Sequence, residues 1–212
     1  MMKRIAMGLT MALGVFAVAA SFLTGTSATA ADTPAVKPGN TATAIFASGC
    51  FWCTESDFEK LPGVIGAESG YTAGKTPNPS YEQVSAGGTG HTEAVRVTYD
   101  PAKVSYTQLV VHFWHNVDPT AKNRQFCDSG SQYRSGIYWQ NAAEREIAES
   151  SRDALLASGK FKEIHTEIIA ATTFYPAEEY HQGYYKKNPI RYNYYRAGCG
   201  RDARLEQLWG KK

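Results

Sequence analysis

Cys50 is the residue of this chain best placed for covalent chemistry. It follows the apolar segment 44–47, which has the character of a short buried strand, and it precedes a pattern typical of a helix. A cysteine at a strand-to-helix junction lies at the positive end of the helix dipole, where its thiolate is stabilised and its pKa is expected to fall. Gly49 allows the tight turn that such a junction requires. We therefore expect Cys50 to be a nucleophile.

A structural role is the alternative for Cys50, either as a buried packing residue or as half of a disulfide with Cys53 that does not turn over. A packing residue gains nothing from a helix start, which favours the catalytic interpretation. Phe51 and Trp52 follow Cys50 directly, so a substrate at the sulfur would also meet an apolar wall. For one of these two rings, packing of the helix start against the core would explain the aromatic residue equally well.

The other cysteines offer several redox arrangements. Cys53 forms a C-x-x-C array with Cys50, whereas Cys127 and Cys199 stand alone farther along the chain. A C-x-x-C pair can close a disulfide and release water from a sulfenic acid. Two purely stabilising disulfides are the alternative in an oxidising compartment, although a core of this size hardly needs them. Zinc would need a second close pair of ligands, so we expect no metal site.

Glu93 is a candidate general acid. It begins the alternating segment 93–99, in which Val95, Val97 and Tyr99 share its face. On an apolar face, desolvation raises the pKa of a carboxyl group and keeps it protonated. An exposed glutamate at a strand end is the commoner outcome, and periodicity alone leaves the two interpretations even.

Five blocks of the sequence resemble, in order, the motifs of the A-type peptide methionine sulfoxide reductase family. They are GCFWCTE at 49–55, GYT at 70–72 with PNPSY at 77–81, GHTEAV at 90–95, GSQYRS at 130–135, and FYPAEEYHQ at 174–182 with KNP at 187–189. Together they extend over about residues 44 to 195. One short motif is weak support, whereas five in the expected order are strong.

The resemblance implies that the chain reduces the S epimer of methionine sulfoxide, free or in proteins, and leaves the R epimer untouched. Cys50 would attack the sulfoxide sulfur and retain the oxygen as a sulfenic acid, or release it as water. Glu93 would be the general acid that protonates this oxygen. Tyr81 and Tyr133 would bind it through their hydroxyl groups. Only their places in the motifs select these two among 13 tyrosines.

The resemblance also implies a substrate pocket and an electron donor. Phe51 and Trp52 would hold the methyl group of the substrate in an apolar pocket. Asp128, just before the fourth motif, would support the polar network. No bound cofactor is implied. A thioredoxin-like thiol protein would supply the electrons.

The resolving cysteine stays open at this point. The family commonly has glycine at the position of Cys53, so the C-x-x-C array is a departure from the family pattern. Cys199 lies in a Gly-Cys-Gly tail of the kind that carries recycling cysteines in relatives, and the glycines would let the tail swing in. Cys127 is beside Asp128 near the expected site. We rank Cys199 and Cys53 ahead of Cys127, and a relay between them is a further route.

An α+β scaffold is expected to position these residues. Besides 44–47 and 93–99, strands are expected over 133–139 and 164–170, and helices over 105–117, 141–158 and 177–187. Ser105 with Gln108 and Asn141 with Glu144 have the spacing of helix caps. The tail from residue 190 is expected to be irregular, with a short amphipathic close. No regular βαβ alternation occurs, which favours a mixed sheet with helices packed on it. The family resemblance implies a two-layer α/β plait.

Residues 1–30 have the pattern of a secretory signal peptide. Lys3 and Arg4 precede an apolar stretch, and Ala28-Thr29-Ala30 is a small-x-small cleavage site. The stretch is short for a membrane span and no basic stop-transfer cluster follows it. We expect cleavage after Ala30 and an exported protein, periplasmic or secreted. A flexible lead-in would follow over 31–43, and then a single catalytic domain over 44–212.

Charge and cysteine usage narrow the remaining function classes. Loss of Lys3 and Arg4 lowers the basic residues from 22 to 20, which equals the 20 acidic ones. This balance gives no electrostatic case for nucleic acid or a membrane surface, and a monomer is expected. A thiol–disulfide oxidoreductase that uses Cys50 and Cys53 is the alternative enzyme, although it would leave Glu93 without a role. A non-catalytic exported domain with two structural disulfides is the third hypothesis.

Overall fold

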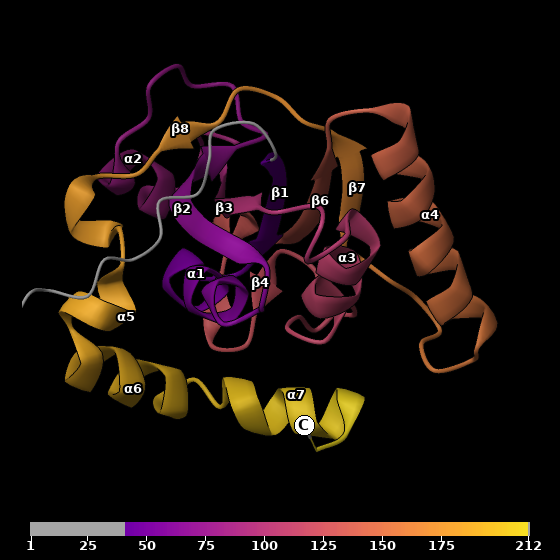
Figure 1. Cartoon of the computed structure of the whole chain (residues 1–212). Helices are drawn as coiled ribbons and strands as arrows, with labels where there is room; N and C mark the ends of the chain where they lie inside the picture. Colours follow the sequence, from indigo (N-terminus) through magenta and orange to yellow (C-terminus); the bar gives the residue numbers. More distant parts are fainter. Residues whose placement is uncertain (1–40, 212) are drawn as a thin grey trace, which may run out of the picture. The chain divides into compact units, whose positions relative to one another are not determined.

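The computed structural model describes residues 41–211, which form one mixed sheet with helices packed on it (Figure 1). The strands of the sheet are β1 (Ala42–Ser48), β2 (Val64–Thr72), β3 (Thr92–Tyr99), β6 (Ser135–Trp139), β7 (Glu167–Ala170) and β8 (Tyr175–Pro176). β4 (Arg124–Gln125) and β5 (Asp128–Ser129) form a separate ribbon. The predicted signal peptide and most of the predicted lead-in lie outside the described residues. Ala42 and Thr43, assigned to the lead-in, belong to β1.

The helices are α1 (Phe51–Glu59), α2 (Tyr81–Ala86), α3 (Tyr106–Trp114), α4 (Ala142–Ala157), α5 (Tyr184–Lys187), α6 (Pro189–Gly198) and α7 (Arg201–Trp209). Two 3₁₀ turns, η1 (Ser131–Tyr133) and η2 (Glu179–His181), accompany them. The strand order is β7-β6-β1-β3-β2-β8, with β6 and β7 parallel and the other neighbours antiparallel. The succession β1-α1-β2-β3-α3-β6 is that of a split βαβ plait. The α+β fold class is therefore confirmed.

The main core lies between the sheet and the helices α1, α3 and α4. Phe46 of β1 stacks on Phe58 of α1 at 4.8 Å and on Phe113 of α3 at 5.5 Å between ring centroids. Val95 and Val97 of β3 are fully buried in the same cluster, as their alternation predicts. Glu93, two residues earlier on that face, is therefore directed into the interior.

The helices α3 and α4 begin at the predicted capping residues. The Ser105 hydroxyl accepts a hydrogen bond from the backbone N–H of Gln108 at 3.2 Å, and the Gln108 side chain accepts one from the Ser105 N–H at 2.8 Å. The Asn141 side chain accepts from the Glu144 N–H at 3.0 Å. These caps satisfy backbone donors that the first helical turn leaves unpaired. The end of α3 at Trp114 comes three residues before the predicted end.

Other predicted elements also differ from the structure. The strand predicted over 133–139 forms only over Ser135–Trp139, because the turn η1 includes Tyr133. The strand predicted over 164–170 forms only over Glu167–Ala170. The helix predicted over 177–187 is replaced by η2 and α5, with a break at Gln182 and Gly183. The Gln182 amide pairs with the backbone of Ser69 in β2, accepting from its N–H at 2.9 Å and donating to its carbonyl at 2.8 Å. The Gln182 side chain thus pairs with backbone groups of β2 as a neighbouring strand would. A continuous helix over 177–187 would prevent this pairing.

The C-terminal tail is not irregular, and its Gly-Cys-Gly segment is not a swinging arm. Cys199 is the residue between two helices, α6 and α7. Gly200 has a left-handed backbone (φ 66°), which lets the chain turn from one helix into the next. Arg201 at the start of α7 is only 2% exposed and anchors the junction in the protein interior. The prediction of a flexible tail is therefore wrong.

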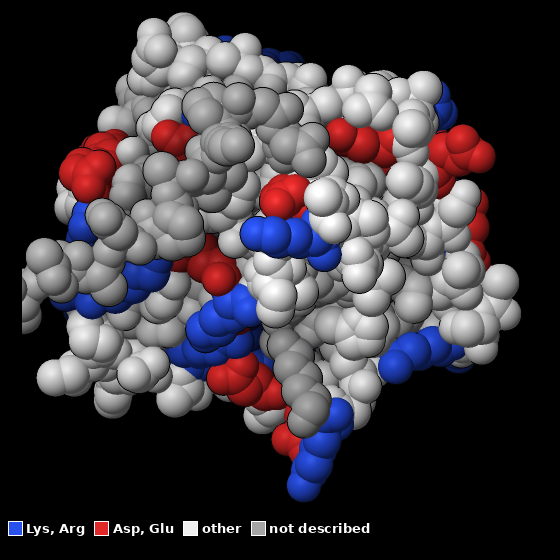
Figure 2. Space-filling view, viewed as in Figure 1, with Lys and Arg blue, Asp and Glu red and all other residues white. Residues whose placement is uncertain are grey.

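The surface carries charges of both signs. Lysine and arginine lie among aspartate and glutamate on the face seen in Figure 2. This mixture fits the balanced composition and forms no large field of one sign there. Within residues 41–211, none of the helices is both long enough and apolar enough to cross a bilayer.

The turn between β1 and α1 is expected to tolerate only glycine. Gly49 has φ of 86°, and a Cβ atom there would lie 2.6 Å from Cβ of Gln125. We predict that Gly49→Ala lowers the free energy of unfolding by about 2 kcal/mol or more, because strain and steric overlap add. Gly198→Ala is the matched control, since a Cβ there meets no atom within 4 Å. Urea denaturation measures both, and equal midpoints would contradict the prediction.

Candidate active site

Cys50 lies at a small cavity of about 180 Å³ at the start of α1. The cavity is lined by Cys50, Phe51, Trp52, Tyr81, Glu93, Asp128, Tyr133 and Tyr195. Seven of these residues are the ones that the sequence motifs select for substrate chemistry. They come from α1, α2, β3, β5 and η1, and only the fold brings these elements together.

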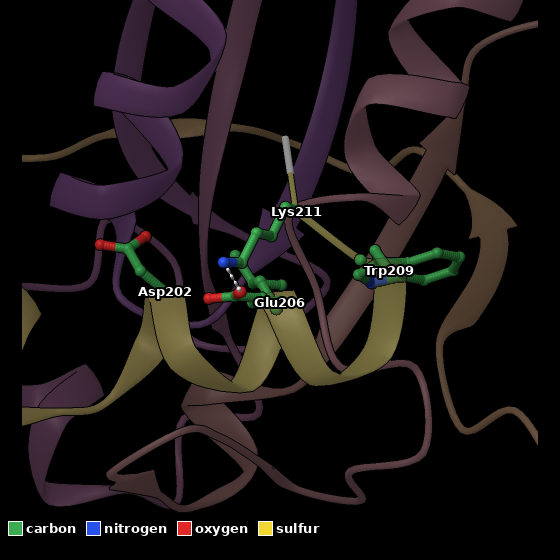
Figure 3. A pocket seen from close by; sticks show the side chains of 6 residues that line it. Asp202, Glu206, Trp209 and Lys211 are labelled. Carbon is green, nitrogen blue, oxygen red and sulfur yellow. Dashed lines mark ion pairs between the residues drawn. The ribbon is translucent and has the colours of Figure 1, made fainter.

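A roomier hollow of about 370 Å³ lies beside α7 (Figure 3). Asp202, Glu206, Trp209 and Lys211 line it, and Lys211 forms an ion pair with Glu206. It contains no cysteine and none of the motif residues. The smaller cavity at Cys50 is therefore the candidate active site, because reactive groups gather there and not beside α7.

Cys50 is the residue that caps the N-terminus of α1, and its backbone carbonyl accepts hydrogen bonds from the N–H groups of Cys53 and Thr54 at 3.1 and 3.2 Å. The strand-to-helix junction is thus as predicted. The predicted fall of its pKa is wrong: burial, the Cys53 thiol and Glu93 raise the pKa of Cys50 well above its ordinary value. Desolvation of a buried thiolate outweighs the helix dipole, whose contribution is about 1 kcal/mol.

Glu93 is 2% exposed and faces the start of α1. Its Oε2 atom accepts a hydrogen bond of 2.9 Å from the backbone N–H of Phe51. Burial raises the pKa of Glu93 to about 8, against the lowering effect of this bond, and the nearby Asp128 adds to the rise. Glu93 is therefore mostly protonated at neutral pH and can donate a proton into the cavity.

The two motif tyrosines can act as neutral donors. Burial and the proximity of Glu93 raise the pKa of Tyr81 to about 12, and the same causes raise the pKa of Tyr133. Both hydroxyl groups therefore keep their protons across the physiological range. With Glu93 they place three O–H donors around one cavity.

Aromatic rings form the apolar side of the site. Phe51 packs against Tyr81 at 6.4 Å and His181 at 4.9 Å between ring centroids, so it serves both core and cavity. Trp52 stacks on Tyr184 at 3.7 Å and with an interplanar angle of 5°. The Trp52 indole N–H donates a hydrogen bond of 2.9 Å to Nδ1 of His181. These contacts hold the indole ring in one orientation.

His181 is a functional residue that motif reading left without a role. It is 2% exposed, and burial lowers its pKa, so that the ring is neutral and Nδ1 can accept from Trp52. The segment that carries it is fastened to α1, because the Gly183 N–H donates to the Glu55 carboxylate at 2.7 Å. The fifth motif contains His181, but only the folded structure pairs it with Trp52.

Tyr195 was missed because the tail was expected to be irregular. On α6 it lines the cavity, meets Trp52 edge to face and donates a hydrogen bond of 2.5 Å to Oδ2 of Asp128. The nearby Tyr195 hydroxyl also lowers the pKa of Cys50, against the larger effect of burial. Asp128 thus belongs to the polar network, with Tyr195 as its direct partner.

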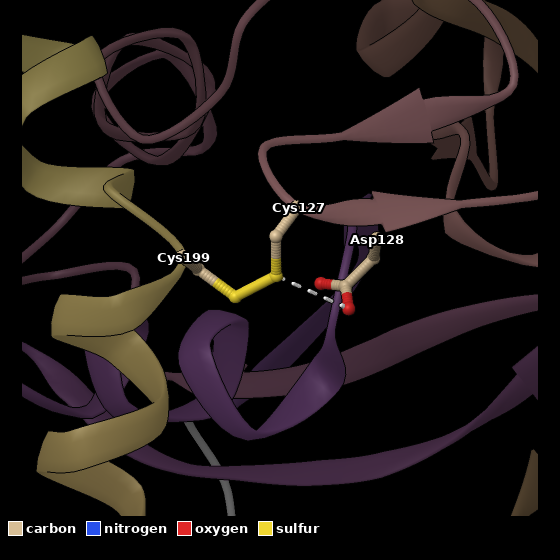
Figure 4. A group of neighbouring side chains, drawn as sticks. All are labelled: Cys127, Asp128 and Cys199. Atoms are coloured by element: carbon tan, nitrogen blue, oxygen red, sulfur yellow. Dashed lines mark hydrogen bonds between the residues drawn. A yellow bond between two sulfur atoms is a disulfide. The ribbon is translucent and has the colours of Figure 1, made fainter.

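The four cysteines form two distinct groups. Cys127 and Cys199 are joined in a disulfide, and Sγ of Cys127 lies 3.7 Å from Oδ1 of Asp128 (Figure 4). A disulfide sulfur has no proton to donate, so this approach is a contact only. Among residues 41–211, this trio is the one set of three side chains with metal-ligand atoms close together, and its two sulfurs are already bonded to each other.

Cys50 and Cys53 are free thiols and are buried. They share a hydrogen bond, which raises the pKa of Cys50 and lowers that of Cys53. The pKa of Cys53 is about 7, because this bond and the guanidinium groups of Arg201 and Arg196 outweigh its burial. The pair titrates as a unit in which Cys53 is the first to lose its proton.

Comparison with known proteins gives one consistent family. The family model for peptide methionine sulfoxide reductase matches residues 42–212. The chain is 51% identical over 180 residues to peptide methionine sulfoxide reductase MsrA 2 of Caulobacter vibrioides, which covers 85% of this chain and 91% of that protein.

Solved structures agree with this result. Methionine sulfoxide reductase A of Corynebacterium diphtheriae has a TM-score of 0.65 and 40% identity, over 73% of this chain and 77% of that one. Mxr1 of Saccharomyces cerevisiae in reduced form has a TM-score of 0.68 and 33% identity, over 73% and 89%. Mxr1 in complex with Trx2 aligns at 24% identity and a TM-score of 0.50, over 71% and 91%, a likeness of fold alone.

Replacing the buried acid tests the site directly. We predict that Glu93→Gln slows reduction of a methionine sulfoxide peptide in the first turnover by ~10²–10⁴-fold, because an amide cannot donate the proton. The wild-type rate should fall as the pH rises through about 8, where Glu93 loses its proton, and this limb should be absent in the variant. Glu146→Gln, at an exposed position of α4, is the control. A change of less than about threefold would assign the proton to another group.

Proposed function

The chain belongs to the peptide methionine sulfoxide reductase family and reduces methionine sulfoxide to methionine, and we propose that Cys50, Glu93, Tyr81 and Tyr133 carry out this reaction. The observation that supports the assignment is their convergence on one cavity in which a cysteine faces a protonated carboxyl group. A nucleophile beside a neutral acid is what reduction of a sulfoxide requires.

In the first step the Cys50 sulfur attacks the sulfur atom of the sulfoxide. Glu93 protonates the sulfoxide oxygen, and the Tyr81 and Tyr133 hydroxyl groups stabilise it by hydrogen bonds as the sulfur–oxygen bond weakens. Transfer of this oxygen to Cys50 gives methionine and a Cys50 sulfenic acid, and the proton released by the Cys50 thiol returns Glu93 to its neutral form. The substrate sulfur is reduced by two electrons, and the Cys50 sulfur is oxidised by two.

We assign selection of the epimer to the aromatic wall. The two epimers exchange the positions of oxygen and lone pair at sulfur. If Phe51 and Trp52 fix the methyl group, only one epimer can direct its oxygen toward Glu93 and the tyrosines. The hydrogen bond from Trp52 to His181 supports this assignment, because it fixes the wall in place.

We propose that Cys53 resolves the sulfenic acid. The Cys53 thiolate attacks the Cys50 sulfur, a Cys50–Cys53 disulfide forms, and hydroxide leaves as water after it takes up a proton. Cys53 is free and hydrogen-bonded to Cys50, whereas Cys199 is bonded to Cys127. These contacts favour Cys53 over Cys199, two candidates that the sequence left side by side.

We propose that Cys127 and Cys199, here called the outer pair, connect the site to its reductant. Cys50 and Cys53 are 7% and 2% exposed, which hinders direct exchange with a protein thiol or disulfide, whereas Cys127 is exposed. In this scheme the reduced Cys127–Cys199 pair takes over the disulfide from Cys50 and Cys53. A thioredoxin-like protein then reduces the outer disulfide. The Mxr1 complex with Trx2 supports a reductant of this class for the yeast relative, and we extend it to this chain.

Repair of oxidised methionine outside the cytoplasm is the proposed cellular role. It is supported by the signal-peptide pattern over 1–30, with export to the periplasm or the exterior. A disulfide at an exposed site fits an oxidising compartment. A mature protein that begins at Ala31 in the exported fraction is the expected finding, and an uncleaved cytoplasmic chain would contradict it.

The activity and its stereochemistry can be tested together. We expect the protein to convert peptides that contain the S epimer of methionine sulfoxide and to leave the R epimer unreacted over the same time. Cys50→Ser is the control and should abolish conversion with the fold intact, because a hydroxyl oxygen is a far weaker nucleophile than a cysteine sulfur. Comparable rates for the two epimers would rule out the proposed geometry.

The recycling scheme predicts different defects for the two cysteine pairs. With the Cys127–Cys199 disulfide intact at the start, the wild-type protein should contain a Cys50–Cys53 disulfide after one equivalent of substrate, whereas Cys53→Ser should keep a sulfenic acid that dimedone traps. The double variant Cys127→Ser/Cys199→Ser should complete the first turnover but slow with thioredoxin as donor, and small dithiols should restore its turnover. Peptide mapping and steady-state rates measure these effects. Normal thioredoxin-dependent turnover in the double variant would exclude the outer pair.

A further inference from the structure

A buried cluster of charges lies behind the C-x-x-C pair. The Asp57 carboxylate of α1 binds the guanidinium of Arg196 at 2.9 Å and that of Arg201 at 3.3 Å. The Asp57 and Arg201 side chains are 6% and 2% exposed, and that of Arg196 is 13% exposed. Charged groups this deep in a protein are rare unless their charges are balanced.

The cluster surrounds Cys53. Asp57 is four residues after Cys53 in α1, which places both on the same side of the helix. Arg196 donates a hydrogen bond of 3.1 Å to the hydroxyl of Tyr192, whose side chain packs in one cluster with Cys53. Arg201 donates to the carbonyl of Ser48 at 3.0 Å, two residues before Cys50. From α6 and α7, the two guanidinium groups thus bind neighbours of Cys53, and their charges act on its thiol.

The charges of this cluster do not cancel among its own three members. Two guanidinium groups share one buried carboxylate, which leaves one positive charge in excess. Asp202 also binds Arg196, but its side chain is 67% exposed and lies on the solvent side. Inside the protein, a thiolate on Cys53 would supply the missing negative charge. Two buried guanidinium groups beside a single buried carboxylate favour ionisation of this thiol through their positive charge.

We propose that Arg196 and Arg201 hold Cys53 as a thiolate and so make it the resolving nucleophile of this enzyme. The proposal rests on the proposed function, in which Cys53 attacks the Cys50 sulfenic acid. The two arginines are positioning residues that touch neither the substrate nor the reacting sulfurs. Because only a thiolate attacks the sulfenic acid efficiently, this charge placement sets the rate of resolution near neutral pH.

Several titratable and charged groups act on Cys53 from the elements packed around it. They are Cys50 and Asp57 of α1, Glu93 of β3, Tyr192 and Arg196 of α6, and Arg201 of α7. The Cys50 thiol favours the thiolate through its hydrogen bond, and the arginines favour it through their charge. Burial and the Asp57 carboxylate oppose it. Arg196 and Asp57 thus act on Cys53 with opposite signs.

This opposition provides the test. In a Cys50→Ser background with the Cys127–Cys199 disulfide intact, Cys53 is the one remaining free thiol. Its ionisation can be followed by thiolate absorbance at about 240 nm, below the pH at which tyrosines ionise. Relative to this background, we expect the midpoint to be raised by about one unit or more in Arg196→Gln and to be lowered in Asp57→Asn. Arg196→Lys, which keeps the charge, should lie close to the parent.

A purely structural role would not give shifts of opposite sign. A midpoint that is unchanged in Arg196→Gln, or that moves in the same direction in both variants, overturns the proposal. Arg201→Lys is a second arm if Asp57→Asn does not fold, and it should likewise retain the midpoint of the parent. In otherwise wild-type protein, Arg196→Gln should accumulate the Cys50 sulfenic acid at pH 7 and lose this defect at pH 9. The titration involves no turnover, so its result is independent of whether Cys53 is the resolving residue.

Discussion

The hydrogen bond from the Phe51 N–H to the Glu93 carboxyl joins the two halves of the active site. It connects the first turn of α1 to β3 through the protein interior, over 2.9 Å. Because an amide so deeply buried needs a partner, the bond fixes where α1 begins relative to the sheet. Cys50 precedes that amide directly, so the distance between nucleophile and acid is set by backbone geometry. The tight turn at Gly49 is the local condition for this arrangement.

Exclusion of water is the main cause of the pKa shifts in the cavity. Its consequences differ between the carboxyl and hydroxyl groups and the Cys50 thiol. It keeps Glu93 and the tyrosines protonated, as the proposed proton donor and the two proposed hydrogen-bond donors must be. It also disfavours the Cys50 thiolate. A buried thiol pair can lose a proton near neutral pH only if positive charge lies nearby. Arg196 of α6 and Arg201 of α7 supply this charge. The C-terminal helices therefore belong to the active site and do more than cover it.

Much of the scaffold could be predicted from local sequence. The caps at Ser105 and Asn141 depend on residues three positions apart, and the inward direction of Glu93 follows from alternation within one strand. Prediction failed where a distant partner decides the local structure. The break at Gln182 exists because its amide pairs with Ser69, which is 113 residues away in the sequence. The helices after residue 189 depend on the burial of Arg201 and Leu205, which tail composition does not indicate.

By itself the sequence determined the family and selected Cys50 and Glu93 as candidates for the nucleophile and the acid, because these are read from residue types and short spacings. Only the tertiary structure decided how the four cysteines pair, since the partner of Cys199 is 72 residues away and no local pattern specifies it. It also decided the direction of the cysteine pKa shifts. The helix dipole at Cys50 can be read from the sequence, but desolvation and the charges around Cys53 come from elements that only folding brings together.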